Sequence, residues 1–127
     1  MPLTLHFEFG TVQVFENHIV VIMKEGITVK PAHTHNLINI AEKYYKDTYF
    51  GYITCRKNSY SVNPLVYLET SKIENLIALA FVSENGLKAS NLQVEQIFSK
   101  KPLRHFTNLD RAKEWINELI EEKTLKK

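Results

Sequence analysis

Seven consecutive apolar residues, Leu76–Val82, constrain the fold of this chain more than any other feature of its sequence. A strand with one solvated face alternates apolar and polar side chains, whereas this run is apolar on both faces. Such a strand is typical of the centre of a parallel sheet that is covered on both sides. The run is also far shorter than the roughly 20 residues that a membrane-spanning helix needs. The sequence therefore predicts an α/β protein without a transmembrane segment.

Hydrophobic periodicity predicts strands and helices on either side of this central strand. The strands are expected over residues 3–9, 12–14, 18–23, 49–55, 76–82 and 103–106. The helices are expected over residues 31–46, 63–70, 91–99 and from 107 onward. Strands that alternate with helices imply crossovers and a mostly parallel sheet, while tight N-terminal connections imply antiparallel strands there. We expect a single STAS-like α/β domain over residues 1–127, with a mixed sheet and about four helices.

The composition is that of an ordinary globular protein without a nucleic-acid partner. The chain has 127 residues, of which 44% are hydrophobic and 24% charged, enough for a core of its own. Its 16 basic and 14 acidic residues leave a formal charge of +2, too small to indicate a nucleic-acid-binding surface. Cys55 is the only cysteine, so no internal disulfide can form. Because the N-terminus lacks the pattern of a signal peptide, the expected location is the cytoplasm.

Three segments follow predicted parallel strands, at residues 24–29, 56–63 and 83–88, and are expected to meet at one edge of the sheet. Ligands of open α/β sheets bind outside the carboxyl ends of the strands. Segment 56–63 combines cationic groups, hydroxyls and an expected helix start, which together can hold a phosphate or carboxylate. Its candidate binding residues are Arg56, Lys57, Asn58, Ser59, Tyr60, Ser61 and Asn63. Serine and asparagine also cap helices and stabilise turns without any ligand, which is the alternative interpretation.

Other motifs give weaker grounds for a chemical activity. His33 and His35 are two residues apart, so on a helix their side chains diverge and cannot easily share a metal ion. The glycines are isolated, so no dinucleotide or P-loop fingerprint can be written. We therefore predict no metal and no cofactor. Cys55, Glu25 and Ser61 are the residues that an enzyme would use, but the sequence names no substrate for them.

The layout of the chain resembles the SpoIIAA-like group, relatives of the STAS domains of anti-sigma-factor antagonists. The resemblance extends over nearly the whole chain and is carried by residues 77–83, 104–106 and 110–116, with an Ala-x-x-Trp helix in the last. Residues 52–64 also look like small proteins that carry STAS/SEC14 names. In STAS proteins, the corresponding loop has an Asp-Ser pair whose serine is phosphorylated to control partner binding. This chain has Tyr60-Ser61 at that place and lacks the aspartate. The resemblance implies Ser59 and Ser61 as the candidate phosphorylation sites.

Three functions agree with these patterns. The first is a non-catalytic regulatory or interaction module of STAS type, which binds a protein partner or a small anionic ligand. It would form a homodimer if its N-terminal strands leave an exposed edge. The second is a carrier or sensor of a lipid or another small molecule, which the SEC14 part of the family label suggests. The third is an enzyme of unknown class.

Overall fold

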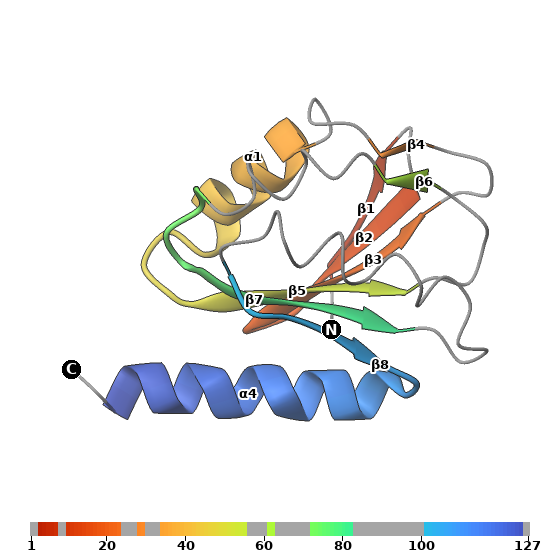
Figure 1. The fold of residues 1–127 in the computed structure, drawn as a ribbon. Helices are drawn as coiled ribbons and strands as arrows, with labels where there is room; N and C mark the ends of the chain where they lie inside the picture. Colours follow the sequence, from red (N-terminus) through yellow and green to blue (C-terminus); the bar gives the residue numbers. More distant parts are fainter. Residues whose placement is uncertain are drawn as a thin grey trace.

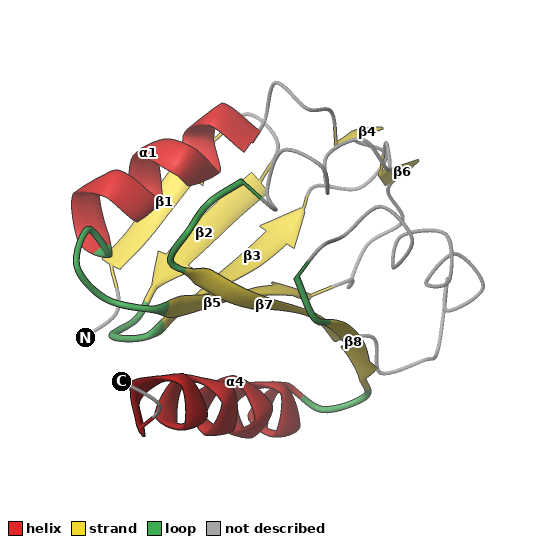
Figure 2. Cartoon of the chain, turned by 60° about the vertical axis from the view of Figure 1, so that its left-hand side comes forward, coloured by secondary structure: helices red, strands yellow, loops and turns green. Residues whose placement is uncertain are grey.

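The computed structural model describes residues 3–7, 10–23, 28–29, 34–55, 61–62, 72–82 and 101–125. In this part of the chain, a six-stranded mixed sheet has α1 on one face and α4 on the other (Figures 1 and 2). The elements are β1 (Leu3–Phe7), β2 (Gly10–Val14), β3 (His18–Met23), β4 (Thr28–Val29), α1 (Thr34–Tyr44), β5 (Phe50–Cys55), β6 (Ser61–Val62), β7 (Leu76–Val82), β8 (Leu103–Phe106) and α4 (Leu109–Leu125). The α/β class that the sequence predicts is confirmed. Neither described helix is long and apolar enough to cross a membrane.

The large sheet has the strand order β1-β2-β3-β5-β7-β8. β1 pairs with β2 and β2 with β3 in antiparallel fashion, and β3, β5, β7 and β8 are parallel. The apolar run is therefore an interior strand, and all seven of its residues are buried. These pairings confirm the predicted mixed sheet, mostly parallel with antiparallel N-terminal strands.

The first core lies between the sheet and α1. Leu37, Ile40 and Ala41 are the buried residues of the helix. They belong to one cluster with the sheet residues Val12, Val14, Ile19, Val21, Phe50, Leu76, Leu79, Phe81 and Leu103. Just after the helix, the Tyr45 ring stacks on Phe50 with 4.5 Å between centroids. Its hydroxyl lies 2.6 Å from the carbonyl oxygen of Phe15 and 2.9 Å from that of His18, and these two acceptors share its single proton, which fixes the end of α1 to the β2–β3 turn.

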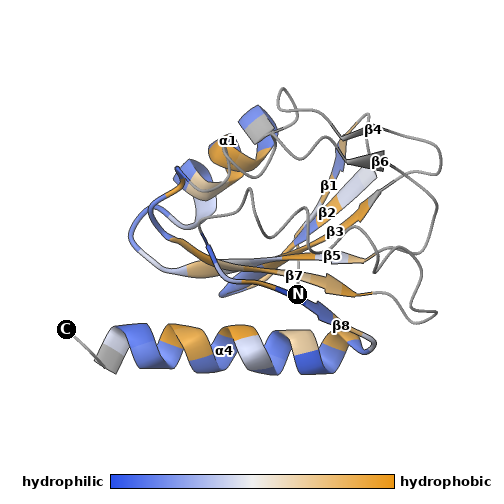
Figure 3. Ribbon diagram, in the orientation of Figure 1, coloured by the Kyte–Doolittle hydropathy of each residue, from blue (hydrophilic) through white to orange (hydrophobic). Residues whose placement is uncertain are grey.

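The second core lies between the sheet and α4. Ala112 and Ile116 of the helix are fully buried. They pack in one cluster with Val20, Ile53, Cys55, Ala80 and Val82. Figure 3 shows the apolar residues along β5 and β7 and the alternation of apolar and polar residues along α4. The helix comes close to β5 at Gly51, where an added Cβ would lie 2.5 Å from two carbon atoms of Ile116.

Two details differ from the sequence-based expectations, and two of the expected helices stay predictions. The spacing of Thr107 and Asp110 resembles a capping box and predicts Thr107 as the N-cap of α4. In the structure, Oδ1 of Asn108 accepts hydrogen bonds from the backbone amides of Asp110 (2.8 Å) and Arg111 (3.3 Å), so Asn108 is the N-cap. Asparagine is the stronger N-cap of the two neighbours. The two-residue strands β4 and β6 were not predicted, because two residues are too short for a periodic pattern. The helices expected at 63–70 and 91–99 lie outside the described residues, so the structure describes two of the four.

Candidate functional site

The four parallel strands end together at one edge of the sheet, called the carboxyl edge below. Cys55 of β5 is the register partner of both Ile22 in β3 and Val82 in β7. Val82 is in turn the partner of Phe106 in β8. The segments that leave these strands therefore start from neighbouring positions, as the sequence predicts.

The short strands β4 and β6 pair the described parts of two of these segments, residues 28–29 and 61–62. β4 follows β3, β6 follows β5, and the two pair in parallel with Thr28 opposite Ser61 and Val29 opposite Val62 (Figure 1). This ladder joins segment 24–29 to segment 56–63 through their backbones. This pairing fixes the backbone of Ser61, one of the predicted binding residues, next to Thr28.

The predicted binding residues are described only in part. Ser61 is the first residue of β6, where its backbone pairs with Thr28. Arg56, Lys57, Asn58, Ser59, Tyr60 and Asn63 lie outside the described residues, as do Glu25, His33 and segment 83–88. Cys55 is buried within the core beneath α4, which favours a packing role over a nucleophilic one.

No protein-family model, curated protein or solved structure matches this chain. The resemblance to the SpoIIAA-like group therefore stays a prediction from the sequence. In the part of the chain that the structure describes, no three histidine, cysteine or acidic side chains come together as metal ligands.

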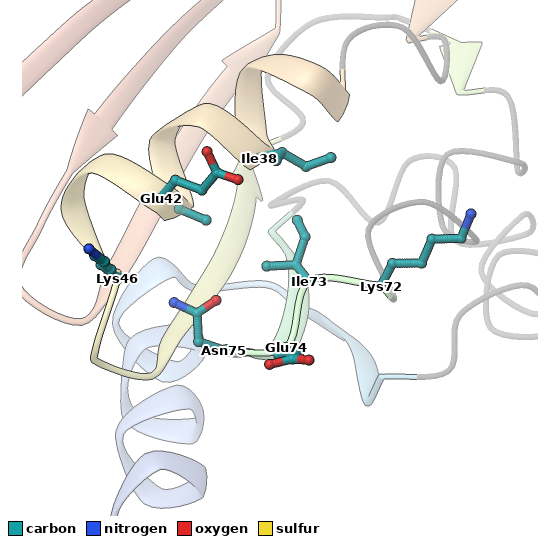
Figure 4. A pocket seen from close by; sticks show the side chains of 8 residues that line it. Ile38, Glu42, Lys46, Lys72, Ile73, Glu74 and Asn75 are labelled. Carbon is teal, nitrogen blue, oxygen red and sulfur yellow. The ribbon is translucent and has the colours of Figure 1, made fainter.

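A pocket of about 290 Å³ lies at the opposite, amino edge of the sheet, between α1 and the turn that precedes β7. Its lining consists of Ile38, Ala41, Glu42, Lys46, Lys72, Ile73, Glu74 and Asn75. Figure 4 shows Ile38 and Ile73 facing the same space, whereas Lys72 and Glu74 extend outward from the turn. The pocket therefore combines an apolar floor with exposed charges of both signs at its rim.

Asn75 fixes one wall of this pocket. Its side-chain amide donates to the carbonyl of Tyr45 and, at 3.0 Å, to the carbonyl of Thr48. These bonds satisfy carbonyls just beyond the end of α1 and tie the turn to the helix. The sequence analysis missed the pocket because its two halves are about 30 residues apart in the chain and neither forms a motif.

A second polar group that the sequence analysis did not single out is His18, at the first position of β3. Only 8% of its surface is exposed, and its ring stacks on Phe15 with 4.6 Å between centroids. Nδ1 lies 2.8 Å from the side-chain oxygen of Asn17, while Nε2 is buried and has no hydrogen-bond partner among the residues that the structure describes. Burial, and secondly the positive charge of Lys113, lowers the pKa of His18 to about 4. His18 is thus a neutral group beneath α4 at ordinary pH.

Proposed function

We propose that this chain is a non-catalytic regulatory module of STAS type, placed in the cytoplasm, that binds an anionic group through segment 56–63. The anionic group would be carried by a protein partner or by a small ligand. The observation that supports this most is the β4–β6 ladder, which pairs residues 28–29 of the segment after β3 with residues 61–62 of the segment after β5. Arg56 and Lys57 directly follow Cys55, the last residue of β5, so the chain enters its cationic segment at this edge.

The chemistry of the segment agrees with this role. Two cations next to three hydroxyl side chains can make charge-assisted hydrogen bonds to a phosphate or carboxylate. Phosphorylation of Ser59 or Ser61 would add about two negative charges beside Arg56 and Lys57. A phosphate on this segment would then compete with the anionic group for Arg56 and Lys57. Phosphorylation would thus switch off binding of the partner or ligand.

We expect the double variant Arg56→Glu/Lys57→Glu to bind inorganic pyrophosphate at least about tenfold more weakly than the wild type. Loss of a single charge-assisted contact of about 1.5 kcal/mol suffices for a tenfold effect. Isothermal titration calorimetry at low ionic strength measures the affinity, because salt screens exposed charges.

The matched control is Lys43→Glu/Lys123→Glu, which makes the same change of net charge. Both lysines are exposed near the ends of α1 and α4, on the side of the amino edge. This control should bind pyrophosphate like the wild type. Equal weakening in the two double variants would show that only net charge matters and would contradict a site at segment 56–63.

The pocket at the amino edge favours a second candidate function, that of a small-molecule carrier or sensor. Its volume of about 290 Å³ is at the lower end of the roughly 300–1,000 Å³ of ligand pockets, so it suits a small amphipathic molecule better than a long-chain lipid. Native mass spectrometry of freshly purified protein should then show a bound small molecule. We expect Ile38→Glu, which puts a charge on the pocket lining, to lose that molecule, and Asn39→Glu on the exposed face of α1 to keep it.

A further inference from the structure

The large sheet has two edge strands, and their chemistry differs. β1 and β8 are the outermost strands in the order. β8 has the sequence Leu-Arg-His-Phe, and Arg104 is exposed on it. β1 has the sequence Leu-Thr-Leu-His-Phe and contains no lysine, arginine, acidic residue or proline. Natural sheets use such residues to prevent edge-to-edge pairing, so β1 lacks the protection that β8 has.

The side chains of β1 divide into an apolar and a polar face. Leu3 and Leu5 are register partners of Val14 and Val12, which belong to the core on the α1 side. The Leu3 side chain is nonetheless 44% exposed. Among the residues that the structure describes, it is the only large hydrophobic one that is exposed. Thr4 and His6 are exposed on the other face. The apolar face of the sheet therefore extends to the edge without being fully covered there.

We propose that β1 pairs with β1 of a second copy of this chain, antiparallel and centred on Leu5, so that two sheets become one. Two-fold symmetry with this centre places Leu5 opposite Leu5 of the other copy. It also places Leu3 opposite Phe7, and Thr4 opposite His6. The apolar face then continues from one copy to the next, and the polar face meets a polar face.

A second copy of β1 fits this edge better than an acidic or a basic strand of another protein does. A strand edge is recognised by another strand, because the backbone N–H and C=O groups of two strands form complementary ladders. β1 offers no formal charge to attract an acidic or basic strand, whereas two copies of β1 meet without repulsion. The same pairing of β8 would put Arg104 opposite His105, which disfavours that edge. The proposal is independent of the anion-binding function, since β1 is not part of segment 56–63.

Disulfide cross-linking tests both the dimer and its register. Directly opposed residues of antiparallel strands have Cβ atoms about 4.5–5.5 Å apart, close to disulfide geometry, while diagonal neighbours are about 7–8 Å apart. We expect Leu5→Cys to form a covalent dimer under mild oxidation at least about tenfold faster than Thr4→Cys, whose two copies are diagonal neighbours. The wild type, with its buried Cys55, is the uncrosslinked control. Random collisions would favour the more exposed position 4, so faster cross-linking of Thr4→Cys would overturn the register.

Sedimentation equilibrium supplies the second measurement without any covalent bond. The wild type should dimerise at micromolar concentration. Thr4→Lys/His6→Lys should raise the dimer dissociation constant at least about tenfold, because it places lysines opposite lysines across the two-fold axis. The control Thr11→Lys/Gln13→Lys puts the same charges on β2 and should leave the dimer intact. A wild type that is monomeric at 100 µM (about 1.5 mg/mL), or a dimer unchanged by the lysines on β1, would overturn the proposal.

Discussion

Replacing Gly51 by alanine is expected to lower the free energy of unfolding by about 1–3 kcal/mol, and replacing it by valine by more. A Cβ at this position would lie 2.5 Å from Cδ1 and Cγ2 of Ile116 and 2.8 Å from Cγ1. Ile116 is fully buried and branched at Cβ, so it cannot turn all three carbons away without disturbing the core beneath α4. Chemical denaturation measures the loss.

A double-mutant cycle with Ile116→Ala is the control for this prediction. Ile116→Ala alone should cost about 2–5 kcal/mol, because it leaves a cavity. In Gly51→Ala/Ile116→Ala the added methyl group occupies space that the isoleucine has vacated, so the double variant should be more stable than the sum of the two losses implies. Additive losses would show that α4 does not touch β5 at Gly51.

The second large effect is a loss of stability at acid pH that is due to His18. Its pKa is about 4 in the folded protein and about 6.5 in the unfolded chain, so the unfolded chain binds the proton more tightly. Neutral His18 therefore makes its full contribution to the free energy of unfolding above pH 6.5. This contribution falls as the pH drops from 6.5 to 4 and is lost below pH 4. The difference corresponds to about 3 kcal/mol. Denaturation series at pH 7, 5.5 and 4 measure it.

The variant His18→Leu isolates this effect from the titration of other groups. Leucine keeps an uncharged side chain beneath α4, so the variant should lose markedly less stability between pH 7 and pH 4 than the wild type. His35→Leu, at an exposed position of α1 and outside the proposed β1 interface, is the matched control and should keep the wild-type pH profile. Identical profiles for all three proteins would mean that His18 can take up a proton in the folded state without cost.

Most of the large sheet could be predicted from the sequence because its signals are strong. The run Leu76–Val82 is apolar on both faces, and the alternation at the N-terminus leaves few other arrangements. The sequence pattern predicts the cap of α4 at Thr107, one residue too early, because Thr107 and Asn108 are both polar and only the hydrogen bonds distinguish them. The β4–β6 ladder depends on two segments that meet through the fold, so no local pattern predicts it.

The two candidate sites, at the carboxyl edge and at the amino edge, also differ in whether the sequence predicts them. The carboxyl edge could be predicted, because the direction of parallel strands alone determines where segments such as 56–63 begin. The pocket at the amino edge could not, because Ile38 and Ile73 form its floor only once α1 and the turn before β7 are packed together. The burial of Nε2 of His18 is likewise a product of packing beneath α4 rather than of neighbours in sequence.

The most direct measurement of the central claim is a titration of ¹⁵N-labelled protein with inorganic pyrophosphate, followed residue by residue through the backbone amides. Binding at the carboxyl edge predicts that the largest changes in chemical shift occur in 56–63 and at Thr28 and Val29 across the ladder, with none at residues 72–75. Changes confined to the pocket residues of α1 and of 72–75, or no changes at all, would contradict the account.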